Sequence, residues 1–255
     1  MGKVIAVANQ KGGVGKTTTG INLAASLART RRRVMLIDFD PQGNATVGSG
    51  VEKTQFSKTI YHVLIGDVEI NEAKRTSEAG FDLVPANADL SGAQVELINE
   101  IGRELKLRLA LATVREEYDY IFIDCPPALN LLTINALVAA DAVIIPMQCE
   151  YFALEGLTAL INTIRKIRET LNPRLRIEGL LRTMFDGRNT LANEVSDQLR
   201  RHFGDKVYRT IIPRNVRLAE APSYGKAVIN YDENSKGAQA YLALAGEILR
   251  REHVA

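Results

Sequence analysis

The chain has 255 residues, of which 46% are hydrophobic and 24% are charged, and its formal net charge is +2. These proportions are ordinary for a soluble globular protein. No apolar stretch approaches the ~20 residues that a membrane span requires, and the first residues do not read as a secretory leader. Two cysteines, Cys125 and Cys149, are too few for a disulfide framework. We therefore expect a cytoplasmic protein that folds as one α/β domain over residues 1–255.

Apolar runs of strand length alternate with segments of helical periodicity along the chain. Several of the runs are nearly continuous in Val, Ile and Leu, which indicates strands covered on both faces. The alternation predicts right-handed βαβ units and a doubly wound, mostly parallel sheet with helices on both faces. The polar stretch Gly48–Ala79 is expected to form loops and short helices. The predicted strands are Val4–Ala8, Val34–Phe39, Phe81–Pro85, Tyr120–Asp124, Ala142–Met147, Ile177–Met184 and Val207–Ile212. The predicted helices are Lys16–Arg29, Gly92–Val114, Leu131–Ala139, Leu154–Leu171, Leu191–Phe203 and Ser235–Arg251.

The segment between the first strand and the first helix has the composition of a phosphate-binding loop. Its glycines allow backbone conformations that turn N–H groups toward an anion, and the following helix adds its positive end. Lys16 can reach the β- and γ-phosphates of a nucleotide, and the Thr17 hydroxyl can coordinate Mg²⁺. The alternative is a turn that only links strand to helix, but the Gly-Lys-Thr ending favours a P-loop NTPase. The predicted nucleotide-binding residues here are Lys11, Gly12, Gly13, Val14, Gly15, Lys16, Thr17 and Thr18.

The loop departs from the common G-x-x-x-x-G-K-[ST] pattern, because Gln10 stands at the first glycine position and Lys11 follows it. This is the deviant Walker A signature, and from Gly2 to about Ala245 the chain resembles the ParA/Soj partitioning ATPases, a SIMIBI-like group that also includes MinD-like members. The matching segments are Lys11-Gly-Gly-Val-Gly-Lys-Thr-Thr18, Asp38-Phe-Asp-Pro-Gln-Gly-Asn-Ala-Thr46, Tyr120-Ile-Phe-Ile-Asp-Cys-Pro-Pro127, Gln148-Cys-Glu-Tyr-Phe-Ala-Leu-Glu-Gly156 and Ile212-Pro-Arg-Asn-Val-Arg-Leu-Ala-Glu-Ala-Pro222. The last two of these segments are characteristic of the partitioning branch.

The resemblance implies a homodimer that is held together by ATP. Lys11 would contact the phosphates bound to the partner subunit, and Gly12 would lie where the two loops meet; the alternative is that Lys11 points to solvent. Two nucleotides bring dense negative charge to one interface, which a lysine from each side offsets. Lys11, Lys16 and Asp40 form the predicted catalytic set.

Three aspartates follow or close predicted strands, where ligands bind in such folds. By the resemblance, Asp40 positions the attacking water and Asp124 is the Walker B carboxylate. Thr17, Asp38 and Asp124 are the predicted Mg²⁺ site, while the alternative is that these aspartates cap turns. Cys125 is expected to be a packed residue, because no second cysteine is placed to hold a metal cluster with it.

The last predicted strand leads into a segment that contacts the nucleobase in the family. A proline ring and an asparagine amide can supply the flat packing and the polar edge contacts that adenine needs. Pro213 and Asn215 are therefore assigned to adenine, with Met184 from another strand end lining the same pocket. The alternative is an ordinary loop.

Residues 174–251 contain 14 Lys and Arg against 9 Asp and Glu, a bias that suggests a polyanion-facing surface but that surface scatter can also produce. We expect non-specific DNA binding through phosphates, with Arg188 and Arg217 favoured among six candidates. The resemblance adds nucleoid association and a ParB/Spo0J-type partner that stimulates hydrolysis. A helix-turn-helix domain is not expected upstream of the loop, and a MinD-like membrane switch and a metabolic ligase remain alternatives. The six candidates are Arg182, Arg188, Arg209, Arg214, Arg217 and Lys236.

Overall fold

The computed structural model describes residues 2–52 and 56–252. Across these residues the strands form one eight-stranded sheet in the order β3-β4-β2-β5-β1-β6-β7-β8. Neighbouring strands pair in parallel, except that β3 runs antiparallel to β4. The doubly wound α/β fold expected from the sequence is therefore confirmed. The strands are β1 (Lys3–Val7), β2 (Val34–Asp38), β3 (Arg75–Thr76), β4 (Asp82–Val84), β5 (Tyr120–Asp124), β6 (Ala142–Gln148), β7 (Arg176–Phe185) and β8 (Val207–Pro213).

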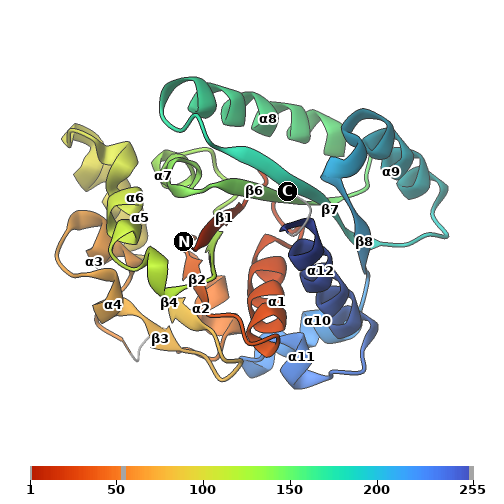
Figure 1. Cartoon of the computed structure of the whole chain (residues 1–255), viewed down its shortest axis with the longest axis horizontal. Coiled ribbons are helices and arrows are strands. Elements are labelled where there is room, and N and C mark those ends of the chain that lie inside the picture. The colour runs from red at the N-terminus through yellow and green to blue at the C-terminus, as the bar shows by residue number, and fades with distance from the viewer. Residues whose placement is uncertain (1, 53–55, 253–255) are drawn as a thin grey trace.

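Helices cover both faces of the sheet (Figure 1). The helices α7, α8 and α9 lie on one face, and α1 and α12 lie on the other with α10 and α11 beside them. No helix in the described ranges is both long and apolar enough to cross a membrane. The helices are α1 (Lys16–Arg29), α2 (Asn44–Gly48), α3 (Ile60–Ile65), α4 (Ile70–Ala73), α5 (Leu90–Glu96), α6 (Lys106–Ala112), α7 (Leu131–Ala139), α8 (Ala153–Thr170), α9 (Thr190–Phe203), α10 (Val216–Glu220), α11 (Val228–Tyr231) and α12 (Lys236–Glu252).

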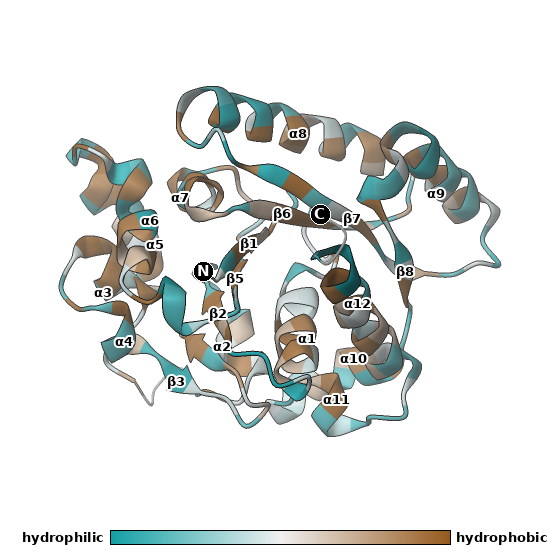
Figure 2. Cartoon of the chain, viewed as in Figure 1, coloured by the Kyte–Doolittle hydropathy of each residue, from teal (hydrophilic) through white to brown (hydrophobic). Residues whose placement is uncertain are grey.

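The alternation of side chains along each strand divides the apolar core into two layers. In β1, Val4 and Ala6 pack into the layer under α7 and α8, whereas Ile5 and Val7 pack into the layer under α1 and α12. Figure 2 shows the central strands in brown, while α8 carries brown and teal turns in alternation. Strands that are apolar on both sides and helices that are apolar on one side are what a buried parallel sheet requires.

The predicted helix over Gly92–Val114 is wrong as a continuous helix, because the chain breaks between α5 and α6. Gly102 adopts a φ of 72°, a left-handed conformation that ends regular helix. The apolar spacing was misleading, since Ile98 and Ile101 are exposed while Leu97 and Leu107 enter the core. The other five predicted helices are present, and α1 and α7 have the predicted bounds.

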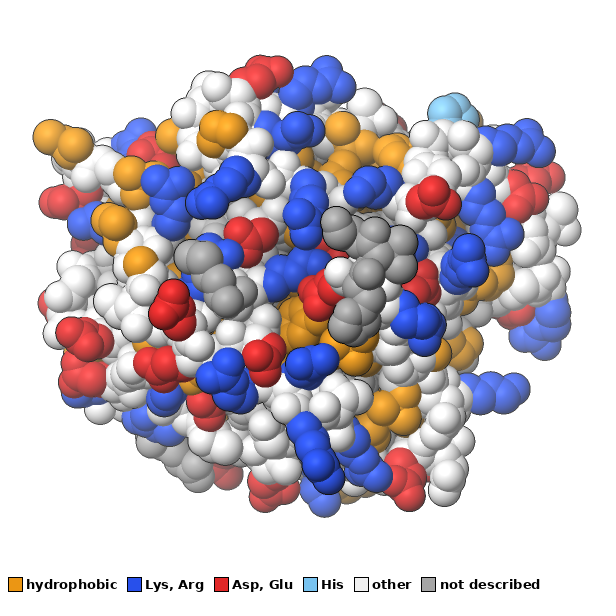
Figure 3. All heavy atoms as spheres, viewed as in Figure 1, with side chains coloured by type: hydrophobic (Ala, Val, Ile, Leu, Met, Phe, Trp, Pro, Cys, Tyr) orange, Lys and Arg blue, Asp and Glu red, His pale blue; other side chains and the backbone are white. Residues whose placement is uncertain are grey.

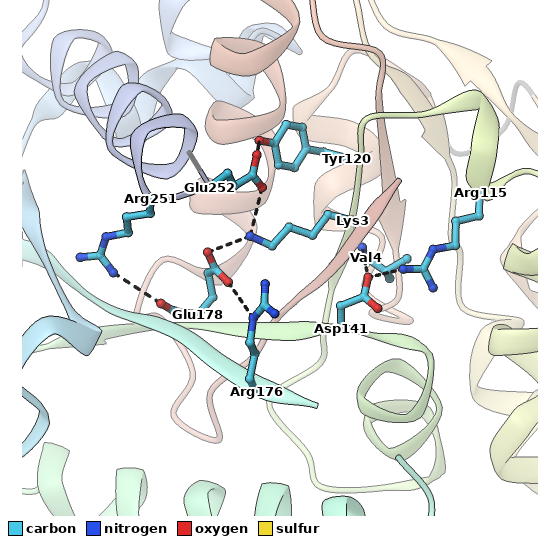
Figure 4. Close-up of polar contacts among 9 residues, drawn as sticks. All are labelled: Lys3, Val4, Arg115, Tyr120, Asp141, Arg176, Glu178, Arg251 and Glu252. Atoms are coloured by element: carbon cyan, nitrogen blue, oxygen red, sulfur yellow. Dashed lines mark hydrogen bonds and ion pairs between the residues drawn. The ribbon is translucent and has the colours of Figure 1, made fainter. Parts of the chain in front are cut away.

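A network of paired charges lies at the amino ends of the strands (Figure 4). The Lys3 ammonium donates to the carboxylates of Glu178 at 2.9 Å and Glu252 at 3.1 Å. Glu178 is also 3.7 Å from the guanidinium of Arg176. These pairs connect β1, β7 and the end of α12, so they hold together three elements that are distant in sequence.

Candidate nucleotide site

The loop that joins β1 to α1 is fixed in place by two neighbouring strands. Gly13 and Gly15 have φ values of 71° and 87°, which only glycine adopts without strain. The amide of Asn9 donates to the Pro146 carbonyl at 2.8 Å. The Thr183 hydroxyl donates to the Val14 carbonyl at 2.8 Å. Sequence reasoning missed these last two anchors, because each depends on a strand that is far away along the chain.

Lys16 is almost fully buried at the start of α1, and it forms no ion pair with a carboxylate in the described part of the chain. Its ammonium donates to the Lys11 carbonyl at 3.1 Å. Burial lowers the pKa of Lys16, while the nearby Asp124 carboxylate acts in the opposite direction. The lysine is thus a buried cation whose ammonium donates to a neutral carbonyl oxygen of its own loop. From this position the ammonium can exchange that oxygen for a bound anion.

Asp38 and Asp124 lie side by side at the carboxyl ends of β2 and β5, and both are fully buried. One Asp38 oxygen accepts hydrogen bonds from the Thr46 N–H and hydroxyl, each at 2.7 Å, and the other accepts from the Asp40 N–H at 3.2 Å. Burial raises the pKa of Asp38 to about 6. The structure therefore gives Asp38 the turn-capping role that was the alternative, and its place in the metal site stays a prediction.

The Asp124 carboxylate is buried without a hydrogen bond of standard geometry to either oxygen. Its pKa is raised well above the usual value, first by burial and then by the neighbouring Asp38, while the Thr17 hydroxyl and Lys16 lower it. An unpaired buried carboxylate is costly unless a cation or a donor joins it. Asp124 and Thr17 therefore fit Mg²⁺, which takes few protein ligands and completes its shell with phosphates and water.

Within the described residues, no group of three or more His, Cys, Asp or Glu side chains is placed to hold a metal. Cys125 is buried, its thiol lies 3.7 Å from the Ile123 carbonyl, and burial raises its pKa. It is a packed residue, as expected from the sequence.

A cleft of about 800 Å³ opens over this loop at the carboxyl ends of the strands. The predicted residues that line it are Gly12, Gly13, Gly15, Lys16, Thr17, Thr18, Asp40, Met184, Pro213 and Asn215. Lys11, Val14, Asp38 and Asp124 lie behind or beside the lining rather than in it. Gln42, Asn44, Lys226 and Tyr241 also line the cleft and were not predicted. Gln42 and Asn44 lie within the matching segment Asp38–Thr46, which is the signal that could have identified them.

Two residues that line the cleft, Asn215 and Met184, have features that are typical of a ligand pocket. The Asn215 side-chain oxygen is buried and has no hydrogen-bond partner in the described chain. Met184 adopts a φ of 48°, which is rare for a residue with a side chain and is concentrated at functional sites. All three residues that the sequence assigned to the base pocket, Met184, Pro213 and Asn215, line this one cleft.

A family model described as an AAA domain matches residues 2–177. The chain is 54% identical to the chromosome partitioning protein ParA of Caulobacter vibrioides over 98% of this chain and 95% of that protein. It is also 54% identical to the chromosome-partitioning ATPase Soj of Thermus thermophilus, over 97% of this chain and 95% of that one. The chain belongs to the ParA/Soj family of partitioning ATPases.

A solved structure of similar fold is the cobyrinic acid a,c-diamide synthase of Mycobacterium smegmatis with a bound ATP analog and magnesium. It has a TM-score of 0.87 and 38% identity, and the match covers 99% of this chain and 96% of that one. As a member of the ParA/Soj family the chain is an ATPase.

The two walls of this ATPase cleft meet at a pair of glycines. Gly50 follows α2 and Gly225 precedes α11, and both have positive φ values, 85° and 61°. A Cβ on Gly225 would lie 2.6 Å from the Gly50 Cα, and one on Gly50 would lie 2.8 Å from the Gly225 carbonyl oxygen. The contact is backbone against backbone, so no side chain can be added at either position without moving a wall.

The signature lysine of the family, Lys11, is held by a residue of the same chain. Its ammonium lies 2.5 Å from a Glu150 carboxylate oxygen, and the two side chains are 43% and 46% exposed. Immediately after Glu150, Tyr151 and Phe152 are 74% and 69% exposed and touch edge to face. A charged pair and an aromatic pair therefore form one exposed surface beside the P-loop.

The proposed DNA-binding arginines differ in their surroundings. Arg188 is 91% exposed and forms an ion pair with Asp186 at 2.7 Å. Arg217 is half-exposed and pairs with Glu220 at 2.7 Å. Arg182 is wrong as a surface contact, since it is fully buried and its guanidinium donates to Ser196 and to backbone carbonyls of β8. Those carbonyls give the cation enough partners to remain inside.

Proposed function

We propose that the cleft binds ATP with Mg²⁺ and that hydrolysis switches the chain between two association states. The observation that carries this is the buried Asp124 carboxylate, which forms no hydrogen bond of standard geometry in the described chain and interacts with Thr17 and Lys16. Magnesium, when bound, neutralises phosphate and carboxylate charge. Lys16 turns from the Lys11 carbonyl to the phosphates, and the loop N–H groups hold the same oxygens.

Pro213, Asn215 and Met184 form the adenine pocket in this proposal. The unpaired Asn215 oxygen is a hydrogen-bond acceptor, which suits the exocyclic amino group of adenine. The Pro213 ring provides a flat apolar surface for the base. A bound adenine would supply the hydrogen-bond donor that the Asn215 side-chain oxygen lacks within the described chain.

In this proposal Asp40 orients the attacking water, and its position in the cleft lining at the turn after β2 supports that role. One of its oxygens accepts a hydrogen bond from the Gln42 N–H at 3.0 Å, which fixes the carboxylate in the turn. Asp40→Ala should keep the affinity for ATP and lose turnover by about 10²-fold or more. Single-turnover hydrolysis and equilibrium ATP binding measured on the same preparation test this, and equal turnover in the variant would refute the role.

The second part of the proposal is an ATP-dependent homodimer in which Lys11 reaches the partner subunit's phosphates. Gly12 supports this, because a Cβ built there meets nothing within 4 Å and its φ is not in the left-handed region. The described chain itself therefore gives no reason for a glycine, whereas a closely approaching second loop does. The exposed Tyr151 and Phe152 add apolar area to the same surface.

Light scattering with a non-hydrolysable ATP analogue and Mg²⁺ tests the dimer. Lys11→Ala should remain monomeric under conditions in which the unmodified chain dimerises. The matched control is Lys58→Ala, since Lys58 pairs with Glu72 at the same 2.5 Å and has similar exposure. If Lys11→Ala dimerises as well as Lys58→Ala does, the shared-phosphate interface is refuted.

The third part is that the ATP-bound dimer binds DNA non-specifically through Arg188 and Arg217, associates with the nucleoid and is stimulated by a ParB/Spo0J-type partner. Both arginines are exposed but already paired with acids, so DNA phosphates have to replace those acids. Gel shifts with random duplex DNA should require ATP rather than ADP and should weaken in Arg188→Ala and Arg217→Ala. A metabolic ligase would instead show no DNA binding in this assay, and its turnover would require a small-molecule acceptor.

A further inference from the structure

A glycine on α12 lies directly behind the wall of the nucleotide cleft. Gly237 stands in the first turn of α12 and is buried. A Cβ added to it would lie 2.6 Å from Cγ of Leu218 and 3.0 Å from the side-chain oxygen of Asn215. Both of these neighbours line the cleft, whereas Gly237 itself does not. Asn215 and Leu218 are therefore held between α12 on one side and the space for a ligand on the other.

The backbone of α12 does not require a glycine at this position. Gly237 is helical and its φ lies outside the left-handed region, in contrast to Gly13 and Gly15 of the P-loop. Alanine is the better helix former, so the reason for a glycine has to come from its neighbours. A carbon at 2.6 Å from Leu218 cannot be accommodated unless one of the two segments moves. Gly237 thus marks a close approach between α12 and α10.

The face of α12 that carries Gly237 is fixed to the P-loop helix. Tyr241 lies one turn further along this face, is buried, and has its hydroxyl 3.1 Å from the Thr19 hydroxyl of α1. The outer side of α12 faces solvent, with Lys and Arg side chains in view over it (Figure 3), whereas Gly237, Ala238 and Leu244 are buried. A shift of α12 away from α10 would therefore have to disturb its packing on the P-loop helix.

The segment on the other side of this contact is short and less deeply packed. The helix α10 spans only Val216–Glu220, and Val216 is 68% exposed. Asn215 precedes the helix and makes no capping hydrogen bond with its side chain. Of the two segments, α10 is thus the one that can yield. A side chain added at position 237 would displace Asn215 and Leu218 away from α12, which is toward the cleft that they line.

Such a displacement would affect one end of the cleft more than the other. The side-chain oxygen of Asn215 lies against Gly237 and has no hydrogen-bond partner in the described chain, so its depth in the wall depends on that glycine. A flat base needs an open space with polar groups at fixed positions. The phosphate end is formed by other residues, such as Lys16 and Thr17 at the start of α1. Crowding at position 237 should therefore impair contacts to a base and spare contacts to phosphates.

We propose that Gly237 is a positioning residue of the base pocket. By leaving room for Asn215 and Leu218 to lie back against α12, it keeps open the space that the nucleobase enters. The inference rests on the proposed binding of ATP in this cleft, and it adds a residue that does not line the cleft itself. The alternative is that Gly237 only allows α10 to pack on α12, so that it stabilises the fold and has no part in recognition.

The test compares a ligand that has a base with one that has none. Equilibrium binding of a non-hydrolysable ATP analogue and of inorganic triphosphate, each with Mg²⁺, is measured on the full chain. Gly237→Ala should weaken binding of the ATP analogue by roughly tenfold, as expected for an overpacked contact. It should change binding of triphosphate by less than about twofold, because the phosphate end of the cleft is unaltered. Retained triphosphate binding also shows that the variant is folded.

Gly246→Ala is the matched control, because Gly246 lies on the same helix and a Cβ there would meet only the far end of the flexible Arg250 side chain. It should bind both ligands within about twofold of the unmodified chain. A second variant tests the crowding itself. In a Leu218→Ala background the obstructing side chain is gone, so adding Gly237→Ala should weaken binding of the ATP analogue by no more than about threefold.

The inference is overturned, while the proposed function stands, if Gly237→Ala binds the ATP analogue as tightly as the unmodified chain does. Equal weakening of both ligands, or failure of the variant to fold, would overturn it as well, because the glycine would then serve the fold alone. If the unmodified chain binds neither ligand, the proposed ATP site is refuted and this inference with it.

Discussion

Charged side chains at the amino ends of the parallel strands are paired with one another, whereas Asp124 and Lys16 at the carboxyl ends form no ion pair within the described chain. At the amino ends, Lys3 binds two carboxylates and Glu178 binds two cations. At the carboxyl ends, Asp124 forms no hydrogen bond of standard geometry in the described residues, and Lys16 donates to a carbonyl. The same sheet thus carries a balanced charge network at the amino ends of its strands and unpaired charges at their carboxyl ends.

This difference separates residues that stabilise the fold from residues that are available to bind a ligand. A paired buried charge contributes to stability only through its partner, while an unpaired one is tolerated where a ligand supplies the partner. Variants at the carboxyl ends should therefore change activity more than stability, and variants at the amino ends should do the opposite. Four substitutions test this contrast.

Lys16→Ala should have the largest effect. It removes the cation that meets the phosphates, so kcat/KM for ATP should fall by about 10²- to 10³-fold. The free energy of unfolding without nucleotide should not decrease, because the lost ammonium donates only to the Lys11 carbonyl. Steady-state hydrolysis and urea unfolding measure the two quantities. A marked loss of stability would show that Lys16 is part of the structural network.

Asp124→Asn should weaken Mg²⁺-dependent ATP binding and stabilise the nucleotide-free chain. Burial is the first cause that raises the pKa of the Asp124 carboxyl well above its ordinary value, so the stability linked to this group is present at low pH and is lost as pH rises toward its folded pKa. Asparagine cannot ionise, so the variant does not show this loss. Urea unfolding from pH 4 to 7 should show a shallower decline in the variant, and an unchanged slope would contradict the role of the Asp124 charge.

Glu178→Gln should lower the free energy of unfolding by roughly 1–3 kcal/mol, because it leaves Lys3 with one partner instead of two. ATP affinity should stay the same. Glu233→Gln is the control, since Glu233 pairs with Arg29 at 3.0 Å while more than half exposed, and such pairs contribute little. Equal losses in the two variants would mean that burial does not distinguish these networks.

Glu150→Gln should have the smallest effect. Freeing Lys11 from its own chain should make the ATP-dependent dimer roughly two- to fivefold tighter, as expected for an exposed ion pair. Glu72→Gln, which breaks the similar Lys58 pair, should leave the dimer unchanged. Sedimentation with ATP analogue and Mg²⁺ compares the two, and a weaker dimer in Glu150→Gln would show that Glu150 supports the interface.

The sequence was sufficient for seven of the strands, because their apolar runs are long and flanked by glycine or charged residues. It was not sufficient for β3, whose two residues show no periodicity, or for the break at Gly102, because a single glycine within an apolar pattern does not by itself reveal a left-handed φ. The P-loop was predictable because its chemistry is local. The anchors Asn9 and Thr183 were not, since each acts on a residue from another strand or loop.

Arg182 is a second case in which a contact between distant segments of the chain could not be predicted from the sequence. The sequence predicts a surface contact for Arg182, because its pattern does not show the irregular pairing of β8 with β7 beside this arginine. The β8 carbonyls of Tyr208 and Arg209 are what allow it to be buried. The domain extent over residues 1–255 and the individual site roles stay predictions.

The meeting of Gly50 and Gly225 has a mechanical consequence. One glycine belongs to the wall that carries Asp40 and the other to the wall that carries Asn215, and nothing compressible lies between them. A shift of either wall at this contact has to displace the other. With the roles proposed for Asn215 and Asp40, we expect a nucleotide with another base to alter the rate of cleavage as well as its own affinity.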